Sequence, residues 1–133
     1  PDPGPLAGRF ADLIHSARPL PLVGTQFCTA GCAQLHNQWW PQGRDAGLVV
    51  AGFGGGTVPD TMAEALRERA DSGTSIVISS RVPKVTVLPE TMTLVENDWV
   101  VASRYLNPQK AAVLLSLSLA AGCTPLSSFE ALH

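Results

Sequence analysis

The chain has 133 residues, of which 45% are hydrophobic and 15% are charged, and its formal net charge is -2. This length is typical of one domain that buries a hydrophobic core, and the composition excludes an intrinsically disordered tail. The nine basic residues are scattered along the chain, which argues against a nucleic-acid surface because such surfaces need clustered Lys and Arg. The longest apolar stretch, residues 111–121, is shorter than the ~20 residues of a membrane-spanning helix.

The beginning of the chain differs in character from the rest. Residues 1–19 are rich in proline and carry one short apolar pattern, and we interpret them as a linker with an initial helix. Residues 20–133 are assigned to one α/β domain, which begins with a buried strand over residues 20–26 and a helical stretch over residues 32–40. Three cysteines are an odd number, and no second Cys or His pair stands at zinc spacing, so we expect neither a disulfide framework nor a metal site.

The middle of the chain alternates between strand and helix patterns. Residues 45–53 are continuously apolar, which is typical of a strand buried on both faces of a parallel sheet. The three glycines of Gly54–Gly56 follow, and Thr57 is expected to cap a helix that ends near residue 72. Residues 75–79 are rich in β-branched side chains and predict the next strand.

The last third begins with residues 81–98, which show no helical period and are interpreted as an irregular segment with Glu90 and Glu96 as solvated carboxylates. A short strand over residues 99–102 follows, then a helix capped by Asn107, and a last helical turn is expected at residues 127–132. This order predicts a small, mostly parallel sheet of about four strands with helices on both faces, a Rossmann-like arrangement.

Open parallel sheets bind ligands beyond the carboxyl ends of their strands. The segments expected at that rim are residues 25–26, 52–57, 79–83 and 103–107. The glycine run lets the backbone approach a ligand closely, and a helix N-terminus follows it. The pattern Gly52-x-Gly54-x-x-Thr57 is close to a dinucleotide-binding fingerprint but lacks its last glycine, so a small anion- or nucleotide-binding domain stays open as an alternative.

No complete catalytic set is visible in the residues. There is no serine nucleophile elbow and no Cys–His–acid trio, and such chemistry needs a nucleophile with a base in reach. His15, His36 and His133 are expected at surfaces or interfaces, and Trp39 and Trp40 are interpreted as packing residues. The residues alone therefore indicate an α/β domain whose rim suits a ligand or a partner, and they name no reaction.

Three segments, in order and at matching spacing, resemble motifs of the bacterial L-asparaginases. Val49–Pro59 resembles their AG-x-GNGN-x-P loop, Ser79–Pro83 their SSR-x-P strand end, and Leu106–Leu115 their LNPQKAR-x-LL helix. The correspondence runs from about Asp45 to Ala121, and the first forty residues match poorly.

This resemblance implies the C-terminal α/β domain of a two-domain amidohydrolase that converts L-asparagine to L-aspartate and ammonia, with L-glutamine as an alternative substrate. The family's threonine nucleophile and Thr–Asp–Lys group belong to the N-terminal domain. This domain alone is therefore expected to be inactive, with no catalytic residue, metal or cofactor of its own. It is expected to form a homo-oligomer in which it reaches a neighbouring subunit's active site. No compartment is assigned, with the cytoplasm preferred over the periplasm.

The resemblance also implies two substrate contacts at the α-amino end, a polar side chain from the glycine loop and a glutamate from the segment after SSR-x-P. The first falls on Thr57, beside Gly55 and Gly56, and the second on Met92, with Glu90 two residues earlier. A thioether does not bind an ammonium group, so either Glu90 turns inward or recognition has changed. A dimerisation or interaction module without ligand recognition is the further alternative.

Overall fold

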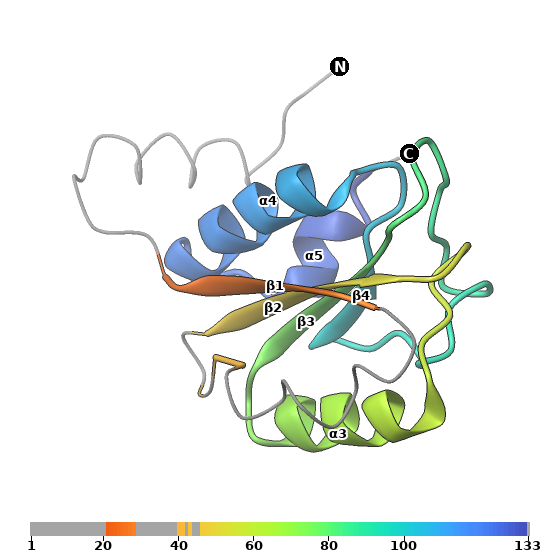
Figure 1. Cartoon of the computed structure of the whole chain (residues 1–133). Coiled ribbons are helices and arrows are strands. Elements are labelled where there is room, and N and C mark those ends of the chain that lie inside the picture. Colours follow the sequence, from red (N-terminus) through yellow and green to blue (C-terminus); the bar gives the residue numbers. More distant parts are fainter. Residues whose placement is uncertain (1–20, 29–39, 42, 44–45, 133) are drawn as a thin grey trace.

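The computed structural model describes residues 21–28, 40–41, 43 and 46–132 (Figure 1). Four strands form a single sheet and follow one another in chain order across it: β1 (Val23–Phe27), β2 (Gly47–Gly52), β3 (Ser75–Ser80) and β4 (Val100–Ala102). All three neighbouring pairs are parallel. The predicted α/β fold with a parallel sheet of four strands is therefore confirmed.

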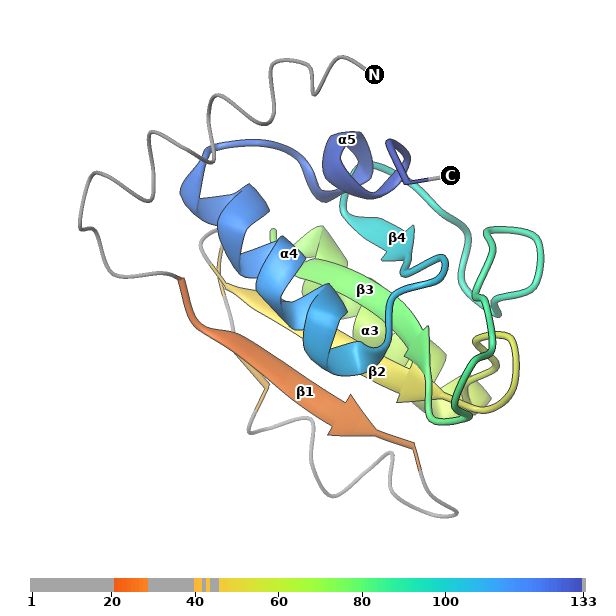
Figure 2. The ribbon, with the colours of Figure 1, turned by 90° about the horizontal axis from the view of Figure 1, so that it is seen from above.

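Helices cover both faces of this sheet (Figure 1). Helix α3 (Asp60–Asp71) lies against one face, and helices α4 (Pro108–Ala120) and α5 (Pro125–Phe129) lie against the other. Seen from above, α4 runs along the sheet over β1 and β2, and α5 lies near β4 (Figure 2). Among the described helices, none combines the length and apolar character that crossing a bilayer requires.

The two central strands are buried along their whole length. Because successive side chains of a strand point to opposite faces, each strand contributes to two separate hydrophobic clusters. Leu48, Val50 and Ile76 belong to the cluster on the α3 side, whereas Val49 and Val77 belong to the cluster on the α4 and α5 side. Burial on both faces explains why the sequence of these strands is continuously apolar rather than alternating.

Two of the predicted helix starts have different outcomes. The cap of α4 is confirmed, because the Asn107 side chain accepts a hydrogen bond from the Lys110 backbone N–H at 2.8 Å. The cap predicted at Thr57 is wrong: α3 begins at Asp60 after Pro59, and no side chain caps it. The main chain of Thr57 instead pairs with Phe53 in an antiparallel bridge.

The last predicted helical turn, at residues 127–132, begins earlier than expected. Helix α5 starts at Pro125, and the Thr124 hydroxyl accepts a hydrogen bond from the Ser127 N–H at 3.3 Å. A capping threonine followed by proline is a helix start that the apolar pattern alone did not reveal.

Several predictions fall on residues that the structure does not describe. These are the initial helix within residues 1–19, the helical stretch over residues 32–39, Trp39 and the three histidines His15, His36 and His133. Trp40 is described and buried, with its indole N–H 3.3 Å from Gln26 Oε1. Its predicted packing role is confirmed.

Candidate functional site

A tight glycine loop, residues 53–57, follows the carboxyl end of β2. The Phe53 N–H donates to the Thr57 carbonyl at 2.8 Å, and the Thr57 N–H donates back to the Phe53 carbonyl at 2.9 Å. Gly54 and Gly56 have φ values of 49° and 108°, in the left-handed region that favours glycine. The loop is therefore a closed turn that exposes the Thr57 side chain at the rim of the sheet.

A second segment, residues 88–93, lies along the glycine loop, and we call it the rim segment. The Thr91 hydroxyl donates to the Gly55 carbonyl at 2.7 Å, and the Val58 N–H donates to Thr93 Oγ1 at 3.1 Å. The Thr93 N–H also donates to the Gly56 carbonyl at 3.3 Å. The fold thus brings together the two stretches in which the sequence placed its substrate-binding candidates, side by side at one end of the sheet (Figure 2).

Met92 and Glu90, the two candidates for the glutamate position, face opposite surroundings. Met92 is 8% exposed and belongs to the hydrophobic cluster on the α3 side. A Cβ added at Gly56 would lie 2.8 Å from Val87 Cγ1 and 2.9 Å from Met92 Cβ, so the lack of a side chain at Gly56 lets Met92 approach the loop. Glu90 is exposed beside Thr91. The structure therefore places Met92 in the core and Glu90 at the surface of the rim.

The longer stretch over residues 81–98 contains no helix or strand, as expected, yet it is fastened at several points. One is an antiparallel bridge between Val87 and Arg104, in which the Val87 N–H donates to the Arg104 carbonyl at 2.9 Å. Another is the Asn97 side chain, which accepts from the Val100 N–H at 2.9 Å. These contacts attach the stretch to β4 and to the residues that follow it.

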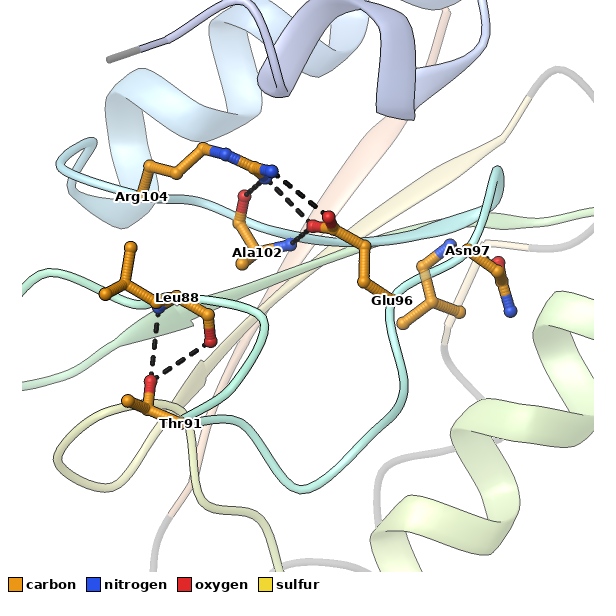
Figure 3. Close-up of polar contacts among 7 residues, drawn as sticks. Leu88, Thr91, Glu96, Asn97, Ala102 and Arg104 are labelled. Atoms are coloured by element: carbon orange, nitrogen blue, oxygen red, sulfur yellow. Dashed lines mark hydrogen bonds and ion pairs between the residues drawn. The ribbon is translucent and has the colours of Figure 1, made fainter.

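Glu96 was predicted to be a solvated carboxylate, and this prediction is wrong. Its two oxygens accept hydrogen bonds from Arg104 at 2.9 and 3.1 Å, and the Ala102 N–H donates to the same carboxylate at 2.9 Å (Figure 3). The two side chains are only 13% and 14% exposed. A bidentate pair of this kind holds a fixed geometry, so Glu96 fastens the loop to the end of β4 and is not available to a ligand.

Arg81, at the end of β3, joins three neighbouring pieces of the rim. Its Nη1 donates to the Cys28 carbonyl at 2.7 Å, and its guanidinium carbon lies 5.4 Å from the centre of the Phe53 ring. Its backbone N–H donates to the Gly52 carbonyl at 2.9 Å. Arg81 therefore ties the end of β1 to the start of the glycine loop, a role that sequence reasoning missed because both partners are distant in the chain.

A cavity of about 280 Å³ opens on the same rim, between the end of β3 and the start of α4. Residues of the expected rim segments 79–83 and 103–107 both line it, as do Phe27 and Lys84. The sequence therefore identified the carboxyl-end rim, and the structure adds that two of its segments enclose a cavity. In the described part of the chain, no group of three or more His, Cys, Asp or Glu residues is placed to hold a metal ion.

Among the described residues, no hydroxyl donates a hydrogen bond to an imidazole or a carboxylate. An activated nucleophile requires such a base within reach. The described rim presents instead an exposed hydroxyl residue at Thr57 and an exposed carboxylate residue at Glu90.

The fold defines the class of the protein as an open parallel α/β domain. The chain belongs to the Glutaminase/Asparaginase C-terminal domain family, whose sequence model matches residues 23–128. The chain is 36% identical to L-asparaginase 2 of Escherichia coli (strain K12) over 106 residues, and this match covers 80% of the chain and 30% of that protein. It is 40% identical to the probable periplasmic L-asparaginase of Haemophilus influenzae over 73 residues, and this second match covers 55% of the chain and 21% of that protein.

A solved structure agrees with these sequence relatives. The crystal structure of a probable cytoplasmic L-asparaginase from Campylobacter jejuni superposes with a TM-score of 0.65 at 28% identity, covering 84% of this chain and 34% of that one. The chain spans 30% of the length of the Escherichia coli relative. The resemblance to the C-terminal domain of L-asparaginases is therefore confirmed, and it concerns this domain of those longer proteins.

Proposed function

We propose that this chain is the substrate-orienting domain of an L-asparaginase-like amidohydrolase, which hydrolyses L-asparagine to L-aspartate and ammonia, with L-glutamine as the alternative substrate. The observation that carries the proposal is the family match over residues 23–128, which includes both the glycine loop and the rim segment. These two segments are joined by the Thr91 hydrogen bond to Gly55. The rim therefore has the parts that an orienting surface needs.

The nucleophile of this reaction is proposed to lie on an N-terminal domain, because the described residues contain no activated hydroxyl. The pocket is proposed to form between that domain and this rim, across the subunits of a homo-oligomer. Exposed apolar side chains beside the cavity support such a contact: Phe27 is 45%, Val82 46% and Tyr105 58% exposed. An exposed apolar group of this kind marks interaction surfaces in soluble proteins.

Within this rim, we propose that Glu90, rather than Met92, binds the α-amino group of the substrate. Met92 packs in the core, and its thioether offers no charge to an ammonium group. Glu90 offers a carboxylate at the surface, two positions earlier. Thr57 contributes its hydroxyl as donor and acceptor. The space beside Gly55 is taken by Thr91, and that beside Gly56 by Val87 and Met92, so these two glycines are proposed to shape the loop rather than to contact the substrate.

Steady-state kinetics test this proposal on the enzyme that contains this chain and its N-terminal domain. The Glu90→Gln variant is expected to raise KM for L-asparagine about ten-fold, because a hydrogen bond between charged groups contributes about 1.5–3 kcal/mol. Met92→Leu conserves core volume and is expected to leave KM unchanged. Glu64→Gln, an exposed carboxylate on α3, is the matched control.

Two results would contradict the proposal at different levels. If the 133-residue chain alone hydrolysed L-asparagine, the nucleophile would lie within it and the orienting role would be wrong. If Glu90→Gln left KM unchanged in an active two-domain enzyme, the assignment of the carboxylate would be wrong.

The second candidate is a dimerisation module whose rim no longer binds substrate. The burial of Met92 at the position expected for the glutamate favours it. It predicts a two-domain protein that forms dimers in light scattering but shows neither L-asparagine hydrolysis nor L-aspartate binding by calorimetry.

A further inference from the structure

The glycine loop and the rim segment meet at one close contact, and we infer that Gly55 and Thr91 form a positioning pair that sets where the Glu90 carboxylate stands. This inference rests on the proposed function, since it takes Glu90 to be the group that binds substrate. Neither residue of the pair needs to touch the substrate. Their proposed effect is exerted through Glu90, which immediately precedes Thr91.

The Thr91 hydroxyl is at the centre of several contacts. It lies 2.7 Å from the Gly55 carbonyl. It also lies 3.1 Å from the Leu88 carbonyl and accepts a hydrogen bond from the Leu88 N–H at 3.1 Å (Figure 3). A hydroxyl has one proton to donate and two lone pairs to accept with. The shorter distance assigns the proton to the Gly55 carbonyl. One side chain thus closes the turn from Leu88 to Thr91 and fastens that turn to the glycine loop.

The contact depends on the missing side chain of Gly55. A Cβ added at this position would lie 3.0 Å from both Cβ and Oγ1 of Thr91, which is closer than ordinary van der Waals contact. The backbone of Gly55, unlike that of Gly54 and Gly56, is not in the left-handed region. The backbone conformation at position 55 would therefore accept other residues. Glycine is required there because Thr91 occupies the space that a side chain would need.

Gly55 also stands where the motif resembled by this loop has an asparagine. A larger residue at this position would meet Thr91 and push the turn outward. Pro89 and Glu90 are the two residues in the middle of that turn, and proline fixes one of its backbone angles. The Glu90 carboxylate is therefore carried on a turn with little freedom as long as Thr91 holds Gly55.

Kinetics on the two-domain enzyme test the pair with Thr91→Val, which keeps the shape and removes the hydroxyl. KM for L-asparagine is expected to rise about five-fold with kcat nearly unchanged, because uniform binding is lost. Thr91→Ser restores the hydroxyl and is expected to restore KM. In the Glu90→Gln background, Thr91→Val is expected to add no further change. Thr86→Val is the matched control, because Thr86 is exposed on the same stretch.

Hydrogen exchange on the 133-residue chain gives a readout that does not depend on activity. The Leu88 amide, which donates to Thr91 Oγ1, is expected to exchange faster in Thr91→Val and in Gly55→Ala, and at the same rate in Thr86→Val. Unchanged exchange at Leu88 in both variants would overturn the pair, whatever the enzyme does. An equal rise in KM with and without Glu90 would overturn the route through Glu90.

The two proposals fail in different ways. Faster exchange at Leu88 together with a silent Glu90→Gln variant would overturn the substrate role of Glu90 and, with it, the positioning function of the pair. A large effect of Glu90→Gln together with a silent Thr91→Val variant would overturn the positioning pair and leave the proposed function intact.

Discussion

Arg104 has a backbone φ of 58°, a left-handed conformation that costs residues other than glycine about 1–2 kcal/mol. It is also the residue whose guanidinium makes the bidentate pair with Glu96. The same guanidinium donates to the Ala102 carbonyl at 2.8 Å, so that it holds both the loop and the end of β4. The backbone cost at this position is therefore tolerated because the side chain has partners that glycine would not provide.

Two substitutions at Arg104 separate these contributions. Arg104→Ala is expected to lower the free energy of unfolding by about 2–3 kcal/mol, because it leaves the largely buried Glu96 carboxylate without its charged partner. Arg104→Gly is expected to lose about 1 kcal/mol less, because glycine relieves the backbone strain. Urea denaturation measures both. Equal losses for the two variants would show that the backbone conformation carries no cost. The control is Lys84→Ala, because Lys84 is exposed and also has a positive φ.

At this scale the sequence predicted residue types better than residue surroundings. Glu96 lies eight positions before its partner and on the other side of β4, so no local spacing indicated the pair. The surroundings of Glu90 and Met92 depend on which way the rim segment turns. The rim segment turns so that Met92 packs close to Gly56. This is a contact between segments that are distant in the chain.

Among the elements, the two central strands were predicted well because burial on both faces leaves a continuous apolar run. The strand predicted over residues 20–26 is observed as β1 at Val23–Phe27, but its predicted burial is wrong, because β1 lies at the edge of the sheet and is only partly buried. The strand predicted over residues 45–53 is observed as β2 at Gly47–Gly52, and that over residues 75–79 as β3 at Ser75–Ser80. The start of α3 was predicted wrongly because Thr57 has the chemistry of a cap, yet its backbone is already committed to the bridge with Phe53. Local propensity was overridden there by the closing of the glycine loop.

The cap of α4 provides a test at the scale of one element. Asn107→Ala is expected to lower the free energy of unfolding by about 1 kcal/mol, because the Lys110 N–H loses its acceptor. Asn107→Gly is expected to cost only a few tenths of a kcal/mol. Thermal unfolding followed by circular dichroism compares the two. A larger loss for glycine than for alanine would contradict the capping role.

For the molecule as a whole, the sheet separates two hydrophobic clusters, and each cluster packs the helices on its own face of the sheet. Counted over the residues that the structure describes, the cluster on the α4 and α5 side is the smaller one, and Phe129 of α5 is its largest fully buried side chain. Helix α5 has only five residues, too short to be stable on its own. Its position therefore depends on Phe129 filling the space beneath it.

Phe129→Ala is expected to lower the free energy of unfolding by about 3–5 kcal/mol, because it removes a fully buried aromatic ring and leaves a cavity. Chemical denaturation measures this loss. Val95→Ala, at a side chain that is 80% exposed, is expected to change stability by less than about 0.5 kcal/mol. A loss below about 1 kcal/mol for Phe129→Ala would mean that α5 does not help to close this side of the sheet.

The parallel arrangement of all neighbouring strands has a kinetic consequence. Parallel neighbours cannot be joined by a hairpin, so every strand pairing must wait until a long stretch of chain has been made and brought round. Chain-closure entropy opposes each of these steps before any contact compensates it, which makes such topologies slow to fold. During synthesis, β1 therefore leaves the ribosome before β2, its partner in the sheet, has been made. The apolar runs of β2 and β3 are exposed to aggregation until their crossovers are complete.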